Sequence, residues 1–166
     1  MATPDSFSPY ESAIKAIATQ IPGSPSREAV LTRLLLHVGS SLGEVFDAKL
    51  KEQGLNYTTW TTLVVLYSHE GHRMLPSALS TVIHASRTHC SRIADDLVKK
   101  GWVARVTSDV DRREVFMQLT PDGQTLVETL QPQRRKQYRA LWTDFSAKEM
   151  TELDGLLRKL LRVLDA

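Results

Sequence analysis

The stretch that decides the fold is residues 86–119, with the sequence SRTHCSRIADDLVKKGWVARVTSDVDRREVFMQL. Its first half has the spacing of an amphipathic helix that begins after Ser86, a good N-cap, and ends before Gly101. One stripe of that helix is apolar or small and is expected to face the core: Cys90, Ile93, Ala94 and Leu97. After Gly101 the period changes to two, which predicts a β-hairpin with a charged tip over 108–113.

The two strands of this hairpin are predicted from alternation on either side of the tip. The apolar side chains on one face of the first strand are Trp102, Ala104 and Val106. Those on one face of the second strand are Val115, Met117 and Leu119. Each strand therefore has one apolar face, as in a half-buried sheet.

Two shorter helices are predicted before residue 86. The first has Thr58 as its N-cap, and the second covers 76–83 with Leu79 and Val82 facing inward. Three short helices followed by a two-stranded hairpin are the parts of a winged helix-turn-helix, which inserts its last helix into a major groove of DNA.

A long helix precedes this module. Ser24 is its expected N-cap, Pro25 its first residue and Gly54 its stop. Its apolar positions are spread around more than one face, so we expect it to pack on its own chain and on a second copy of the chain.

Two more helices follow the hairpin. Thr120 and Pro121 are expected to begin the first of them, and Pro132 is expected to kink or interrupt it. Ser146 and Glu149 have the spacing of a capping box for the last helix. Its leucines are too numerous for one face of an isolated helix: Leu153, Leu156, Leu157, Leu160, Leu161 and Leu164.

The predicted fold class is therefore mainly α with a small β-hairpin wing (α+β): a winged helix-turn-helix with long N- and C-terminal dimerisation helices. We expect three regions within a single intertwined domain. They are an N-terminal arm and dimerisation helix over 1–54, the DNA-binding module over 55–120, and C-terminal dimerisation helices over 121–166.

Composition narrows the class of protein. The chain has 166 residues, 42% hydrophobic and 24% charged, with a net charge of +2, which is typical of a globular protein. We expect it to be cytoplasmic, because it has one cysteine, no N-terminal signal pattern and no apolar run of about 18 residues. It has no glycine-rich phosphate loop and no nucleophile elbow, so we expect neither an enzyme nor a bound cofactor.

The near-neutral total hides a local basic surface. Residues 84–113 hold seven basic and four acidic side chains, whereas the rest of the chain carries a net charge of −1. Such a window fits a partner with a phosphate backbone.

Ser86 and Arg87 stand at a helix N-terminus, where unpaired N–H groups favour a phosphate or a base edge. Arg92 lies on the same face and has the geometry to pair with a guanine. At the tip, we expect Arg112 to pair with Asp109 or Asp111 and Arg113 to enter a minor groove. The predicted DNA contacts are Ser86, Arg87, Thr88, His89, Ser91, Arg92, Arg112 and Arg113.

Several alternatives stay open. Arg92 and Asp96 have the i,i+4 spacing of a pair that supports a helix and does nothing else. Cys90 fits a buried small hydrophobe better than a redox switch, and His69 and His72 lack the spacing of a zinc site, so no metal is predicted. The module could also bind protein, although an arginine tip suits phosphate better than an apolar surface.

These motifs resemble the MarR family of transcriptional regulators. The resemblance rests on SRT at 86–88, SRIADDL at 91–97, GWV at 101–103, DVDRR at 109–113 and LTPDG at 119–123. It extends from about Leu31 to the C-terminus, leaves out the first 25 residues, and within the family is strongest to the EmrR/MprA branch of multidrug-efflux repressors.

Membership implies a homodimer on pseudo-palindromic operator DNA, released by a small phenolic or lipophilic effector. By the same analogy, the residues expected to line an effector cavity are Leu34, His37, Trp60 and Leu63.

Overall fold

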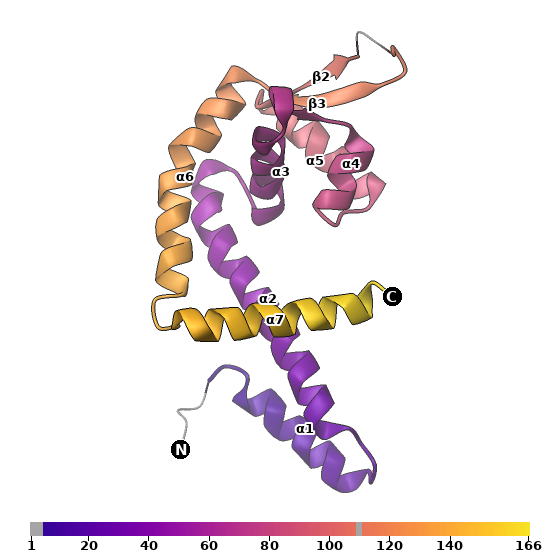
Figure 1. Ribbon diagram of the computed structural model, residues 1–166, viewed down its shortest axis with the longest axis vertical. Helices are drawn as coiled ribbons and strands as arrows, with labels where there is room; N and C mark the ends of the chain where they lie inside the picture. Colours follow the sequence, from indigo (N-terminus) through magenta and orange to yellow (C-terminus); the bar gives the residue numbers. More distant parts are fainter. Residues whose placement is uncertain (1–4, 109–110) are drawn as a thin grey trace. The chain divides into compact units, whose positions relative to one another are not determined.

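The structure is a computed structural model that describes residues 5–108 and 111–166 (Figure 1). The chain forms two compact units. The first comprises Met1–Val65 and Ser77–Ile93, and the second comprises Leu66–Pro76 and Ala94–Ala166. The elements are mostly helical with one small antiparallel sheet, as the sequence predicts.

Seven α-helices and three strands make up the described residues. The helices are α1 (Ser8–Gln20), α2 (Ser26–Leu50), α3 (Tyr57–Ser68), α4 (Pro76–Val82), α5 (Arg87–Lys99), α6 (Pro121–Leu141) and α7 (Ala147–Leu164). Short 3₁₀ turns follow α2 and α3, at Lys51–Gln53 and Glu70–His72. The strands are β1 (Arg73–Met74), β2 (Val103–Thr107) and β3 (Val115–Leu119).

The sheet has one more strand than the sequence predicts. Its order is β1-β3-β2, and both pairings are antiparallel. The extra strand β1 has only two residues, which is too short for an alternating pattern to be recognised. The wing is therefore the β2–β3 hairpin, with the short strand β1 paired to β3 on the side away from β2.

The strand register corrects the predicted grouping of apolar faces. Val103 pairs with Leu119 and Arg105 with Met117, so these four side chains share one face. Val103, Met117 and Leu119 are buried, whereas Ala104 lies half-buried on the opposite face. The apolar residues predicted to share a face on β2, such as Ala104, therefore lie on the opposite side of the sheet from Met117 and Leu119 of β3. Alternation alone does not fix which face of a strand is inward.

Two predicted caps are wrong. Ser24 does not cap α2, since its hydroxyl donates to the Ile21 carbonyl at the end of the preceding helix, 2.8 Å away. Thr58 does not cap α3 either. Asn56 does: its side-chain oxygen accepts the Thr59 N–H at 2.8 Å, and the Thr59 hydroxyl accepts the Asn56 N–H at 2.9 Å.

Three other predicted caps are confirmed. The Ser86 hydroxyl accepts the His89 N–H at the start of α5, 3.2 Å away. Thr120 caps α6, and Ser146 and Glu149 form the capping box of α7. In that box the Glu149 carboxylate accepts the Ser146 hydroxyl and N–H, and both hydrogen bonds lower its pKa.

One expectation about a helix interior is also wrong, and so is part of another. Val82 is exposed, although Leu79 of the same helix is buried as predicted. Pro132 does not interrupt α6, which continues to Leu141. Pro132 and Glu128 are both exposed, so water can solvate the Glu128 carbonyl that loses its helical N–H partner. Buried side chains on both sides, such as Leu130 and Arg134, hold the helix in place.

The segment that contains α2 is more apolar than the sequence predicts. By length and composition alone, Ser26–Gln53 is long and apolar enough to cross a bilayer, with a mean hydropathy of 1.2 over its best 18 residues. Only 6% of that window is buried, so α2 carries a large exposed apolar surface.

The junction between α5, the wing and α6 depends on one close backbone approach. The Thr120 hydroxyl donates to the Gly101 carbonyl at 2.7 Å, and its N–H donates to the Trp102 carbonyl at 3.1 Å. Gly101 has a φ of +74°, a backbone conformation that favours glycine. Gly123 faces the same turn, and a Cβ there would lie 2.1 Å from the Trp102 carbonyl oxygen.

We predict that Gly123→Ala destabilises the protein by about 1–3 kcal/mol, because the first turn of α6 must move away from Trp102. The measurement is the midpoint of urea unfolding followed by circular dichroism. Gly155→Ala in α7 is the matched control, since a Cβ there meets nothing within 4 Å. Alanine at 155 should leave stability unchanged or raise it by up to about 1 kcal/mol. Equal midpoints for the two variants would contradict the role given to Gly123.

Candidate nucleic-acid interface

Helix α5 has one buried face and one exposed face. Cys90, Ile93, Ala94 and Leu97 are buried, which confirms the predicted core stripe. Six residues at the start of the helix are exposed: Ser86, Arg87, Thr88, His89, Ser91 and Arg92. These are the residues that the sequence predicts as DNA contacts, and all six are accessible to a partner.

The acids of α5 are held by cations from outside this face. Asp96 binds the Lys100 ammonium at 2.7 Å, one turn further along. Asp95 binds the Arg105 guanidinium of β2 at 2.6 Å. Asp96 therefore pairs with Lys100 and not with Arg92, so the alternative in which Arg92 only supports the helix does not describe this structure. Within the described residues, neither Arg87 nor Arg92 forms an ion pair.

The Asp95–Arg105 pair was not predicted from the sequence. Its partners are ten residues apart and lie on a helix and a strand, so no helical spacing could reveal it. Both belong to the second unit, where this exposed pair links the C-terminal half of α5 to the wing. Arg105 is therefore already paired within the protein, although it is one of the seven basic residues counted in 84–113.

The hairpin tip is organised by backbone hydrogen bonds around Asp111. Its carboxylate accepts the Arg113 N–H at 2.9 Å, and its own N–H donates to the Ser108 hydroxyl at 3.3 Å. The Ser108 N–H donates to the Glu114 carbonyl at 2.9 Å and closes the turn. Asp111 thus fixes the backbone from which the exposed Arg112 and Arg113 project.

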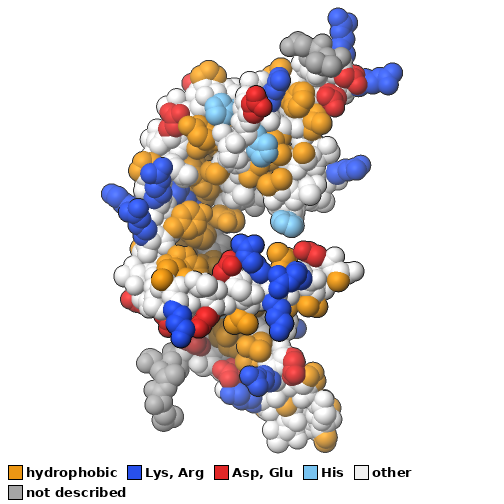
Figure 2. Space-filling view, in the orientation of Figure 1, with side chains coloured by type: hydrophobic (Ala, Val, Ile, Leu, Met, Phe, Trp, Pro, Cys, Tyr) orange, Lys and Arg blue, Asp and Glu red, His pale blue; other side chains and the backbone are white. Residues whose placement is uncertain are grey.

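Basic side chains project from the tip of this hairpin beside acidic ones (Figure 2). Asp109, the other predicted wing-stabilising residue, lies outside the described residues. Among the described residues Arg112 forms no ion pair with Asp111, so only its pairing with Asp109 stays a prediction.

The four residues expected to line an effector cavity do not form one recognisable site. Trp60 and Leu63 are buried at 3% and 0% exposure, and Leu34 is half-buried on α2. His37 instead lines a pocket between α1 and α2, together with residues of the N-terminal arm. No sequence motif marks that pocket, because its residues come from two helices that are far apart in local spacing.

The two histidines of the HEGH stretch have structural contacts. His72 stacks on Tyr67 with ring centroids 4.9 Å apart, and its Nδ1 donates to the Tyr67 carbonyl at 2.8 Å. Tyr67 in turn donates to the Glu128 carboxylate at 2.9 Å, which raises the Tyr67 pKa. Among residues 5–108 and 111–166, no group of three or more His, Cys, Asp or Glu could hold a metal ion.

Comparison with known proteins identifies the class. A family model described as "MarR family" matches residues 53–114. The chain is 40% identical over 160 residues to the Escherichia coli K12 protein named transcriptional repressor MprA. This match covers 96% of this chain and 91% of that protein.

Two solved structures show the same fold. AbsC, a MarR family transcriptional regulator from Streptomyces coelicolor, matches with a TM-score of 0.77 and 27% identity over 84% of this chain and 95% of its own. Sco3205 from the same organism, solved in complex with DNA, matches with a TM-score of 0.79 and 22% identity over 85% of this chain and 89% of its own.

The fold and the exposed basic helix face define a winged-helix transcription regulator. The identity to MprA over nearly the whole chain makes the assignment more specific, and the chain belongs to the MarR family of transcriptional regulators.

Burial makes Cys90 a poor redox sensor. Its side chain is 2% exposed, and burial raises the pKa of its thiol, so the reactive thiolate is scarcer at neutral pH than for an exposed cysteine. The sequence also contains no second cysteine that could resolve an oxidised thiol.

We predict that Cys90 reacts with a thiol reagent at pH 7 at least about tenfold more slowly in the native protein than in urea. The rate is measured by absorbance with an aromatic disulfide reagent. Equal rates in the two conditions would restore the redox alternative.

Proposed function

We propose that this protein is a homodimeric repressor that binds a pseudo-palindromic operator and is released by a small aromatic or lipophilic effector. The observation that carries the DNA-binding part is the exposed face of α5, where Arg87 and Arg92 form no ion pair among the described residues. Both acids of the helix bind other cations, so the positive charge of this face is left for an anionic partner.

The comparisons support this proposal. MprA is named a transcriptional repressor, and Sco3205 has been solved with DNA bound. By this analogy the protein acts in the cytoplasm on promoter DNA and has no catalytic role.

We propose that α5 enters a major groove, with Arg92 on a guanine and Ser86 and Arg87 near phosphates. Arg113 then enters the neighbouring minor groove, and Arg112 braces the tip. Two such modules about 34 Å apart would occupy successive major grooves on one side of the duplex.

The exposed apolar surface of the chain supports a dimer. On α7, six large apolar side chains are between 42% and 73% exposed: Leu156, Leu157, Leu160, Leu161, Val163 and Leu164. On α2, Leu31, Leu35, Val38 and Val45 form a second exposed stripe. Soluble proteins rarely leave such patches uncovered, and a second copy of the same chain covers them with twofold symmetry.

The DNA-binding proposal predicts that Arg113→Ala weakens binding and lowers the slope of log K against log salt by about one per protomer. Its physical reason is that each removed cation no longer displaces a counterion from DNA. The measurement is a fluorescence anisotropy titration at several salt concentrations, with a DNA site that the protein itself selects from a random-sequence pool.

Arg92→Ala provides the contrast within the same experiment. We expect the difference in binding free energy between the selected site and scrambled DNA to fall by about 1–3 kcal/mol, because a base contact is removed. Failure to select any site at low salt would refute the proposed function, and unchanged discrimination in Arg92→Ala would refute base contact by Arg92.

The dimer proposal predicts that Leu160→Glu converts the protein from two chains to one, because it places a charge in the middle of the α7 stripe. Analytical ultracentrifugation measures the mass. Arg162→Glu is the matched control, since residue 162 lies about 160° around the same helix from Leu160 and should leave the dimer intact. A wild-type protein that sediments as a monomer would contradict the dimer.

A further inference from the structure

A histidine occupies the turn between α4 and α5 at a position that suits glycine. The Ala85 N–H donates to the Ser80 carbonyl at 2.9 Å. The His84 N–H donates to the Thr81 carbonyl at 3.2 Å, which completes a Schellman motif at the end of α4. The motif places His84 in the left-handed region, with a φ of +49°. Glycine is the usual residue at such a position, because a Cβ makes this conformation costly.

The side chain of His84 makes no contact that would offset this strain. It is exposed and, in the part of the chain that the structure describes, forms no hydrogen bond, ion pair or ring contact. Among residues 5–108 and 111–166, the other non-glycine residue with a positive φ is His72. Its ring stacks on Tyr67, and its Nδ1 donates to the Tyr67 carbonyl at 2.8 Å. Contacts within the chain therefore account for His72 but not for His84.

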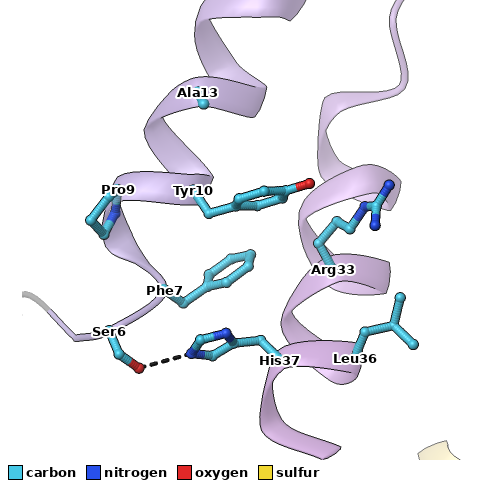
Figure 3. Close-up of a pocket in the computed structure, with 8 residues that line it drawn as sticks. All are labelled: Ser6, Phe7, Pro9, Tyr10, Ala13, Arg33, Leu36 and His37. Atoms are coloured by element: carbon cyan, nitrogen blue, oxygen red, sulfur yellow. Dashed lines mark hydrogen bonds between the residues drawn. The ribbon is translucent and has the colours of Figure 1, made fainter. Parts of the chain in front are cut away.

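The five histidines of the chain divide in the same way. Three of them form a side-chain hydrogen bond within the protein: His37, His69 and His72. That of His37, to the Ser6 hydroxyl at 2.8 Å, is drawn in Figure 3. The imidazoles of His84 and His89 form none with any described residue, and both are exposed. Two imidazoles that are free of internal partners thus lie on either side of the start of α5.

The charges around these two side chains are positive. Helix α4 has no ionisable side chain, and the first two turns of α5 contribute Arg87 and Arg92. The two acids of α5 bind other cations, and no charged side chain of any other described element interacts with His84. A proton on His84 therefore adds charge to a surface that is already positive, and an anionic partner favours that proton.

We propose that His84 binds a phosphate of the DNA backbone as an imidazolium, so that DNA binding takes up a proton from solvent at this turn. Histidine is the side chain whose charge changes near neutral pH, and a phosphate favours its protonated form. Only Ala85 separates His84 from Ser86, the first of the predicted DNA contacts. The inference rests on the proposed function, since it needs DNA on the exposed side of α5. The strain at His84 is then offset in the complex and not in the free protein.

The test measures affinity for the selected DNA site by fluorescence anisotropy at constant ionic strength. As pH falls from about 8 to about 6, we expect wild-type affinity to rise about tenfold, because a proton that is held more tightly in the complex favours the complex at low pH. His84→Asn keeps a residue that tolerates the left-handed conformation but cannot be protonated, and it should limit the rise to about threefold at most. His89→Asn reports the share of the second imidazole. His69→Asn, in the second unit, is the matched control and should follow the wild type.

His84→Gly separates strain from binding. We expect it to raise the midpoint of urea unfolding by about 0.3–1 M, because glycine removes the cost of the left-handed conformation. At about pH 6 it should weaken DNA binding as much as His84→Asn does. A variant that is more stable and yet binds DNA less tightly has not lost affinity through misfolding.

Two results would overturn this inference and leave the DNA-binding proposal intact. One is a wild-type affinity that does not change over this pH range, and the other is a full rise in affinity in His84→Asn. A protein that selects no DNA site at either pH would instead contradict the proposed function, and this inference with it.

Discussion

The pairing of the two acids of α5 decides how its charges are used. Asp95 and Asp96 lie next to each other in the sequence and, unpaired, would offset much of the positive charge of Arg87 and Arg92. Asp95 binds Arg105 of the wing and Asp96 binds Lys100 at the end of the helix. The exposed face thus keeps its positive charge, and the same contacts join helix and wing. One arrangement of ion pairs serves both the fold and the surface.

Hydrogen bonds from Thr120 to the carbonyls of Gly101 and Trp102 also hold the two ends of the wing together. Thr120 caps α6 and at the same time hydrogen-bonds the end of the α5 turn, so α6 begins where the wing returns. Gly123 allows this approach because it lacks a Cβ. The LTPDG motif of 119–123 therefore has a steric origin that is independent of DNA.

The N-terminal helix α1 adds a feature that the helix-turn-helix module does not need. It packs on α2 through Phe7 and the Ser6–His37 hydrogen bond, and the surface it creates is aromatic and cationic. Residues of α1 and of the turn before it thus supply most of the lining of the pocket between α1 and α2. The exposed apolar stripes of α2 and α7 have another proposed role, since each is suited to contact a second chain.

The sequence by itself determined the fold class, the helix-turn-helix and wing, the inward stripe of α5 and three of the caps, because periodicity and capping act over three or four neighbouring residues. It also predicted six residues at the start of α5 as accessible to a partner, and all six are exposed. Tertiary structure alone decided which strand face is buried, that β1 joins the sheet, that Asp95 pairs with Arg105, and that Phe7 and His37 meet. Each of these joins residues whose separation follows no local period, so only the folded chain brings them together.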